Sequence, residues 1–301
     1  MLFRSDLADK FTNYGSSAAA GVTGVMIARY PGTIGNSLKI SYCDNTTRGV
    51  TFTAFAASGA GLGITWSVGT GLTNGGWNIA SVGFTGADAT NQLAKIAVGD
   101  FLKFADSAKS YEVVEKNAST PYKVGLRVIG STADAQTALV GSTSATAVWA
   151  YAKYLNQTLS TSTTTKVKGY SDDEVAVAIV DEDGLVSGTK GGVLETFVGS
   201  KALNGTNLDG TNSYYARKVN NSAYCFWVSH PSGNGSSTAA ELEANTGVNG
   251  LAWGGSLGVV GATSGFQRLV ANVYASLGGG TEDRKSTRLN SSHVSESRMP
   301  S

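Results

Sequence analysis

Residue types that mark common enzyme classes are scarce in this chain. Its 301 residues include only two histidines and two cysteines, and charged residues make up 15% of the total. Without a Cys-x-x-Cys pair or paired histidines, zinc sites and thioredoxin-like chemistry have no support in the sequence. Because Cys43 and Cys225 lie far apart in the chain, we expect two buried free thiols, with a disulfide between them as the alternative.

Strong net charge and long apolar runs are also missing. The formal net charge is +1, which disfavours an electrostatic nucleic-acid binder and removes one barrier to self-association. No stretch of about 18 apolar residues predicts a membrane span. Residues 1–15 do not have the apolar segment of a secretory signal peptide.

Small and β-compatible residues dominate instead. The chain has 39 glycines and many Ser, Thr and Asn residues, but only 4 prolines, and 41% of its residues are hydrophobic. This composition favours a β-rich extracellular or assembly-type protein over a metabolic enzyme. The length allows about two domains.

Periodicity predicts an α+β fold. Residues 1–14 show helical spacing, and Leu38, Ile40 and Tyr42 alternate as in a strand. Three strand-like bursts at 98–104, 111–114 and 122–128 predict a small antiparallel β-barrel or sandwich. We interpret 58–164 as this β-rich domain, inserted into a mixed-sheet domain with flanking helices that comprises 1–57 and 165–281. We expect the two flanks to close on each other as one folded body, with Thr158–Lys168 as a linker or exposed loop.

The segment Ser171–Phe197 predicts a hairpin. Val175, Val177 and Ile179 alternate with smaller residues, which indicates a strand with one well-packed face. Asp183-Gly184 predicts a tight turn, followed by a short extended piece, a glycine break and the entry to a helix or loop. The spacing of the acidic residues does not fit a calcium loop, so we expect a solvated surface turn.

No catalytic, metal-binding or cofactor-binding residues are predicted. His230 precedes a proline and is expected to be a loop residue; a hydrolase would need it beside a nucleophile or a carboxylate pair in a cleft. Asp172, Asp173 and Glu174 are expected to form a solvated acidic face. Gly59–Gly63 matches only part of a dinucleotide-binding fingerprint.

Several sequence landmarks occur together in a fixed order. They are Lys10-Phe11 to Gly15, ARYPGTIGNSLKIS at 28–41, EVAVAIVDEDGLVSGTKGGVLETF at 174–197, DGTNSYYARKVNNSAYCFW at 209–227 and YASLGGGT at 274–281. In order and wording they resemble the tail sheath protein of contractile-tailed bacteriophages. The resemblance covers 1–57 and 165–281, and residues 58–160 match the variable protruding insertion of such proteins less closely.

The resemblance implies a structural subunit without catalytic residues. Its partners would be other sheath subunits in hexameric rings, and the tail tube and baseplate through a core domain expected after Thr281. The implied site residues are structural: Tyr30, Pro31, Gly32, Gly35, Asn36, Leu38, Asp181, Asp183, Gly184, Glu195, Phe197, Gly279 and Gly280.

Two further expectations concern the tail and an alternative function. Residues 282–301 have no apolar periodicity, resemble translated adaptor-like sequence, and are expected to be non-native or disordered. The alternative to a sheath subunit is a β-rich decoration or adhesin module that binds glycans or receptors. That alternative would use Trp66, Trp77 and Trp149 in an aromatic groove.

Overall fold

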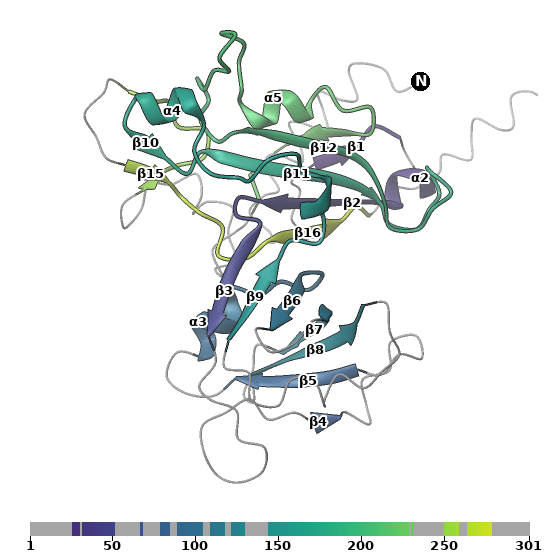
Figure 1. Cartoon of the computed structure of the whole chain (residues 1–301). Coiled ribbons are helices and arrows are strands. Elements are labelled where there is room, and N and C mark those ends of the chain that lie inside the picture. Colours follow the sequence, from purple (N-terminus) through teal and green to yellow (C-terminus); the bar gives the residue numbers. More distant parts are fainter. Residues whose placement is uncertain are drawn as a thin grey trace, which may run out of the picture.

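The computed structural model describes residues 26–30, 32–51, 67–68, 79–84, 89–104, 109–117, 122–129, 144–228, 230–231, 250–258 and 264–278. Within these ranges the chain is rich in strands, has few and short helices, and forms four sheets. The fold is α+β, as predicted. In Figure 1 a seven-stranded sheet lies below the other three sheets.

The four-stranded sheet unites three of the segments that carry the sequence resemblance: 28–41, 174–197 and 274–281. Its order is β12-β11-β2-β16, with β12 at Gly192–Ser200, β11 at Glu174–Asp181, β2 at Leu38–Cys43 and β16 at Val273–Ser276. All neighbouring strands are antiparallel; Ile40, for example, pairs with Ile179 of β11 and Ala275 of β16. Strands from both sides of the predicted insertion therefore lie in one sheet.

Both faces of β11 are packed, which differs from the predicted strand with one packed face. Val175, Val177 and Ile179 are fully buried against the helix α5 (Tyr215–Val219) and the aromatic residues around it. Ala176, Ala178 and Val180 lie on the opposite face, where they contact Cys43, Trp149 and Leu159. Alanine at two of these positions leaves room for the Trp149 ring. The small residues thus mark a second core.

The predicted tight turn after β11 is wrong. β11 and β12 do form an antiparallel hairpin, but residues 182–191 connect them, and the stretch expected to enter a helix or loop is the edge strand β12. Gly184 has the positive φ of 82° that the sequence suggested. The loop is longer because Asp181 binds backbone N–H groups farther along it, as described below.

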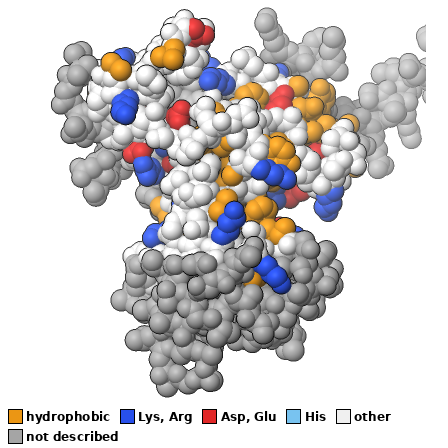
Figure 2. Space-filling model, viewed as in Figure 1, with side chains coloured by type: hydrophobic (Ala, Val, Ile, Leu, Met, Phe, Trp, Pro, Cys, Tyr) orange, Lys and Arg blue, Asp and Glu red, His pale blue; other side chains and the backbone are white. Residues whose placement is uncertain are grey.

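The two-stranded sheet and α5 cover one face of the four-stranded sheet, and the three-stranded sheet has a cluster of its own. β1 (Met26–Ala28) pairs with β13 (Cys225–Trp227), and β10 (Tyr170–Ser171), β15 (Ser264–Phe266) and β14 (Gly250–Leu251) form a parallel sheet. The short helix α2 (Thr33–Asn36) follows Gly32 and ends just before β2. Figure 2 shows hydrophobic side chains on the right of the upper part. Tyr30 and, within α2, Ile34 are exposed apolar residues.

The seven-stranded sheet is antiparallel and has its own core. Its order is β3-β9-β6-β7-β8-β5-β4, where the strands are β3 (Thr47–Thr51), β9 (Ser144–Val148), β6 (Phe101–Phe104), β7 (Ser110–Asn117), β8 (Tyr122–Val128), β5 (Ile79–Phe84) and β4 (Ser67–Val68). Three of these, β6, β7 and β8, coincide with the predicted bursts. The helix α3 (Ala89–Ala94) packs against the sheet. The described strands leave the sheet open rather than closing it into a barrel.

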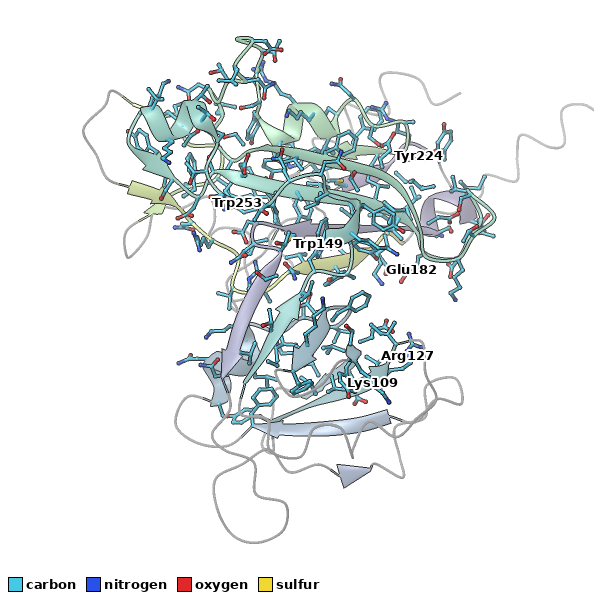
Figure 3. The ribbon with its side chains drawn as sticks, in the orientation of Figure 1. Lys109, Arg127, Trp149, Glu182, Tyr224 and Trp253 are labelled. Carbon is cyan, nitrogen blue, oxygen red and sulfur yellow. The ribbon has the colours of Figure 1, made fainter. Side chains whose placement is uncertain are left out.

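Residues 149–168 pack against the four-stranded sheet. Trp149 is fully buried, and its indole N–H donates to the Ser41 hydroxyl at 2.8 Å; Figure 3 shows it on the lower side of that sheet. After the 3-10 helix η3 (Ala152–Tyr154), the helix α4 (Thr163–Val167) contains the buried Thr165. The prediction of a linker or exposed loop at 158–168 is therefore wrong. Sheet membership also places Thr47–Thr51 with the seven-stranded sheet, although the predicted boundary lies at residue 57.

Candidate functional site

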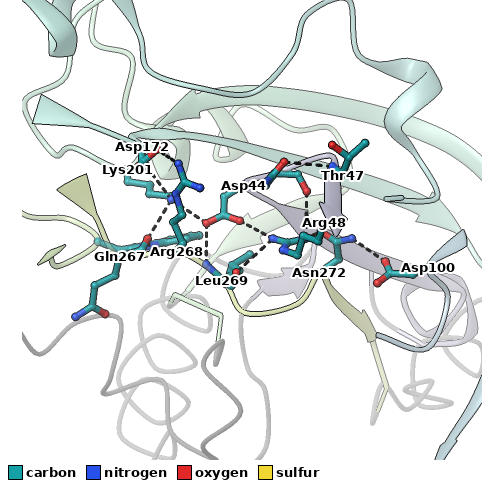
Figure 4. A network of polar contacts seen from close by, with 12 residues as sticks. Asp44, Thr47, Arg48, Asp100, Asp172, Lys201, Gln267, Arg268, Leu269 and Asn272 are labelled. Carbon is teal, nitrogen blue, oxygen red and sulfur yellow. Dashed lines mark hydrogen bonds and ion pairs between the residues drawn. The ribbon is translucent and has the colours of Figure 1, made fainter. Parts of the chain in front are cut away.

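A buried polar network lies where the four-stranded and seven-stranded sheets meet (Figure 4). Asp44 stands between β2 and β3 and receives three donors: Lys201 Nζ at 2.9 Å, Arg48 Nη2 at 2.6 Å and the Leu269 backbone N–H at 2.7 Å. Arg48 also donates to Asn272 Oδ1, and Asn272 donates to Asp100 Oδ1. We call Asp44, Arg48, Asp100, Lys201 and Asn272 the junction network.

The junction network contains charges that are almost completely withdrawn from water. The side chains of Lys201 and Asp44 have no exposed surface, and Arg48 is 8% exposed. Burial lowers the pKa of Lys201, although the carboxylate of Asp44 acts in the opposite direction. Burial likewise raises the pKa of Asp100, opposed by hydrogen bonds from Asn272, the Ala97 backbone and Tyr274. Each group is retained because a partner of opposite charge or matching polarity faces it.

Lys201 has no capacity left for binding a further group. Besides Asp44, its ammonium donates to the backbone oxygens of Asp172 and Gln267, at 2.9 and 3.0 Å. The ammonium also lies 4.9 Å from the centre of the Trp253 ring, on its face. All three protons of an ammonium are thus used. This arrangement holds elements together and offers no nucleophile to a substrate.

Asp181 organises the β11–β12 loop from a buried position. Its carboxylate accepts the backbone N–H groups of Gly184, Val186 and Ser187 and the hydroxyls of Ser187 and Ser37. Burial would raise the pKa of Asp181, but these hydrogen bonds outweigh it and hold the pKa well below its usual range. The expectation of a solvated turn is wrong for Asp181, whereas Asp183 is exposed.

Asp173 has the same role at the other end of β11. It is fully buried and accepts the hydroxyls of Ser162, Thr165 and Ser200 and the backbone N–H of Ser162. The predicted solvated acidic face at 172–174 is therefore wrong at its centre. Asp173 fixes the start of α4 to the ends of β11 and β12.

His230 lies in an aromatic cluster with Tyr214, Tyr215, Trp227 and Trp253. It is 6% exposed, and its Nδ1 lies 2.5 Å from the Tyr215 hydroxyl, which accepts the indole N–H of Trp227. Burial lowers the pKa of His230 to about 4. The histidine lies outside helices and strands, as expected, and among the described residues the rings of Tyr215, Trp227 and Trp253 pack around it.

The motif residues around α2 are brought next to Asp181. Ser37 donates its hydroxyl to Asp181 at 2.6 Å, and its backbone oxygen accepts the Glu182 N–H. Leu38 is fully buried at the start of β2, Asn36 ends α2, and Gly32 precedes α2. A Cβ on Gly35 would lie 2.2 Å from the Tyr30 backbone oxygen. The segment 32–37 thus shapes the end of the sheet.

Some of the other predicted site residues lie away from the group around Ser37 and Asp181. Glu195 and Phe197 lie on β12, where Glu195 accepts the Ala223 N–H and Phe197 packs against the core. Pro31, Gly279 and Gly280 lie outside the described residues. So do the predicted helix at 1–14, Gly59–Gly63 and the tail at 282–301.

Trp149 does not fit the aromatic groove of the alternative function. Because it is fully buried and bound to Ser41, its ring cannot stack on a sugar. Trp66 and Trp77 lie outside the described residues. Cys43 and Cys225 are buried free thiols, which confirms the first of the two expectations for them. The two cysteines belong to different core clusters.

Sequence reasoning did not find the junction network. Its members come from residues 44–48, 100, 201 and 272, and no spacing or motif connects them. Sheet pairing brings them together: β2 pairs with β11 and β16, β11 pairs with β12, and β9 pairs with both β3 and β6. A lysine or an aspartate in a polar stretch is usually exposed, so composition gave no signal either.

Comparisons with known proteins do not assign this chain to a protein family. Family models, curated proteins and solved structures all gave no match to the chain. Within the described ranges, no group of three or more His, Cys, Asp and Glu side chains could hold a metal ion. The helices described there are also too short or too polar to cross a membrane.

Proposed function

We propose that this chain is part of a structural subunit of a contractile bacteriophage tail sheath. The observation that carries the proposal is the assembly of the resembling segments 28–41, 174–197 and 274–281 around one sheet, through β2, β11, β12 and β16. Segments that resemble one protein family in their order support membership of that family more strongly when they also pack together in the fold. Two of these segments are also joined by hydrogen bonds: the Ser37 hydroxyl donates to Asp181 and accepts the Asp183 backbone N–H.

In this proposal the seven-stranded sheet is an outward-facing domain inserted into the sheath fold. Its support is the close approach of the two chain passages, where the Trp149 backbone N–H donates to the Thr46 oxygen at 2.9 Å. A domain whose ends meet is readily carried at one exposed position of another domain.

The proposed activity is mechanical. Sheath subunits would stack in hexameric rings around a tail tube, attached to a baseplate, and contract by rigid-body rearrangement between two sets of subunit contacts. Packed cores on both faces of β11 and charges sealed inside the junction network suit a body that moves as a unit.

Immuno-electron microscopy tests this function. Antibodies raised against the purified chain would be applied to contractile-tailed particles from the material in which the gene occurs. We expect labels along the tail shaft in both extended and contracted particles, and no labels after the antibodies are absorbed with the purified chain. Labels confined to the capsid or to fibre tips would overturn the sheath proposal and favour a decoration or adhesin protein.

A further inference from the structure

Asn272 connects the two large sheets through a single amide. Its Oδ1 accepts Arg48 Nη1 at 2.5 Å, and its Nδ2 donates to Asp100 Oδ1 at 2.7 Å (Figure 4). Arg48 lies on β3 and Asp100 directly precedes β6, both in the seven-stranded sheet, whereas Asn272 directly precedes β16 of the four-stranded sheet. The amide, 4% exposed, therefore satisfies a cation and an anion of the neighbouring sheet at once.

Tyr274 adds a second connection beside the first. Its hydroxyl donates to Asp100 Oδ1 at 2.8 Å and accepts the Ala150 backbone N–H at 3.2 Å. Its ring lies close to Gly99, where an added Cβ would meet the ring carbons at 3.3 Å. Gly99 also has a φ of 102°. The contact therefore depends on a glycine at this position.

Backbone connections between the two sheets are narrow. The chain leaves β2 at Cys43 and enters β3 at Thr47, and it returns from β9 at Val148 to the buried Trp149. These two passages are joined by the hydrogen bond from Trp149 to Thr46. Two adjacent passages can act as a pivot, since rotation about them changes few backbone torsions.

Among the described residues, the apolar cores of the two sheets are separate. The cluster around Leu102, Tyr111 and Leu126 belongs to the seven-stranded sheet alone. The clusters on either face of β11 contain, among the described residues, none of its members. Where an interface is small and polar, relative motion of the two bodies is the ordinary expectation. Directional polar bonds are then what restrains it.

We propose that Asn272 and Tyr274 form a latch that sets the angle between the four-stranded and seven-stranded sheets. When the latch is intact, Asn272 and Tyr274 hold Arg48 and Asp100 from the side of β16. When it is broken, the passages at 43–47 and 148–149 become a hinge. This inference concerns the chain itself and stands whether or not the sheath function is correct.

Distance measurements between two spin labels test the latch in the full chain. Lys103 on β6 and Val167 on α4 are exposed, so Lys103→Cys and Val167→Cys provide attachment sites, while Cys43 and Cys225 are buried. With the latch intact we expect one narrow distance distribution. Asn272→Leu should broaden it about two-fold or shift its centre, because both amide contacts are lost.

Two further variants make the result specific. Tyr274→Phe keeps the ring and removes only the hydroxyl contacts, so it should broaden the distribution less than Asn272→Leu does. Asn212→Leu is the matched control: its amide binds the Leu203 oxygen and the Tyr214 N–H within one body, so the distribution should stay narrow. Far-ultraviolet circular dichroism would verify that each variant is folded.

The latch is refuted if folded Asn272→Leu and Tyr274→Phe both keep the original distribution. If Asn272→Leu does not fold, Tyr274→Phe decides the question alone, because its smaller change preserves the packing at Gly99. Broadening in the Asn212→Leu control to the same extent would also refute it, since general loosening would then explain the effect.

Discussion

Lys201 Nζ and Asp44 Oδ2 lie 2.9 Å apart although the two residues are 157 positions apart in the chain. Both side chains are fully buried. An ion pair withdrawn from water adds little net stability compared with apolar packing, but removing one partner leaves an uncompensated charge. The pair therefore specifies how the chain is arranged, and its disruption should be costly.

Neutralising Asp44 is expected to destabilise the protein strongly. In Asp44→Asn, Lys201 and Arg48 lose the carboxylate between them, and we expect the free energy of unfolding to fall by about 3–5 kcal/mol. Urea denaturation followed by circular dichroism measures this change. The control is Glu182→Gln, in a half-exposed pair with Lys39 at 2.9 Å, where a loss of about 0–1 kcal/mol is expected. Equal losses in both variants would contradict the role given to burial.

Asp181 and Asp183 lie in the same acidic turn but should respond very differently to alanine. Asp181→Ala leaves three backbone N–H groups without their acceptor, which should lower the free energy of unfolding by at least about 3 kcal/mol. Asp183→Ala removes only an exposed ion pair with Lys190 and should change it by less than about 0.5 kcal/mol. Denaturant titrations of the two variants decide between this and a solvated turn.

The Asp181 carboxylate should make the stability of the protein depend on pH in a definite direction. Because the pKa of Asp181 is depressed in the folded protein, its contribution is present above the unfolded pKa of about 3.9 and is lost as the pH falls below it. Asp181→Ala should therefore flatten the fall in stability on acidification, relative to Asp183→Ala. A parallel fall in both variants would show that other groups dominate.

Gly99 should tolerate alanine less well than Gly188. Both have positive φ values, 102° and 78°, but a Cβ on Gly188 would meet nothing within 4 Å, whereas one on Gly99 would press on the Tyr274 ring. Gly188→Ala should cost about 1 kcal/mol for the backbone conformation alone. Gly99→Ala should cost up to about 3 kcal/mol. If thermal denaturation gives equal costs, the contact between Gly99 and Tyr274 is unimportant.

His230 should remain neutral down to mildly acidic pH. Its pKa is lowered to about 4 by burial, so its ring signals in a nuclear magnetic resonance titration should move with a midpoint near that value rather than near 6.5. Because the unfolded chain binds this proton more readily, the contribution of His230 to stability is complete above about pH 6.5 and falls towards pH 4. A midpoint near 6.5 would mean that the ring is in contact with water.

Local patterns in the sequence were sufficient for several strands. Alternation predicted β2 and β11, and the bursts of apolar residues predicted β6, β7 and β8. Period-2 alternation and short apolar bursts bounded by polar turns are the signals that strands produce. The α+β class followed from them.

Other features depend on contacts that no local pattern encodes. The second packed face of β11 consists of Ala176, Ala178 and Val180, and their burial depends on Trp149, a residue near the end of a different sheet. Asp173 and Asp181 occur in acidic runs that normally face water, yet here they receive the donors of neighbouring loops. Pairing across the chain therefore decides which polar residues are buried.

The hydrogen bond between Thr46 and Trp149 has a practical consequence for protein engineering. Since the polypeptide departs and comes back at almost one point, residues 47–148 could be exchanged for a short peptide linker or for a foreign domain with adjacent termini. The remaining scaffold would retain β2, β11, β12 and β16. Such chimaeras would display a chosen cargo at a defined place on the scaffold's surface.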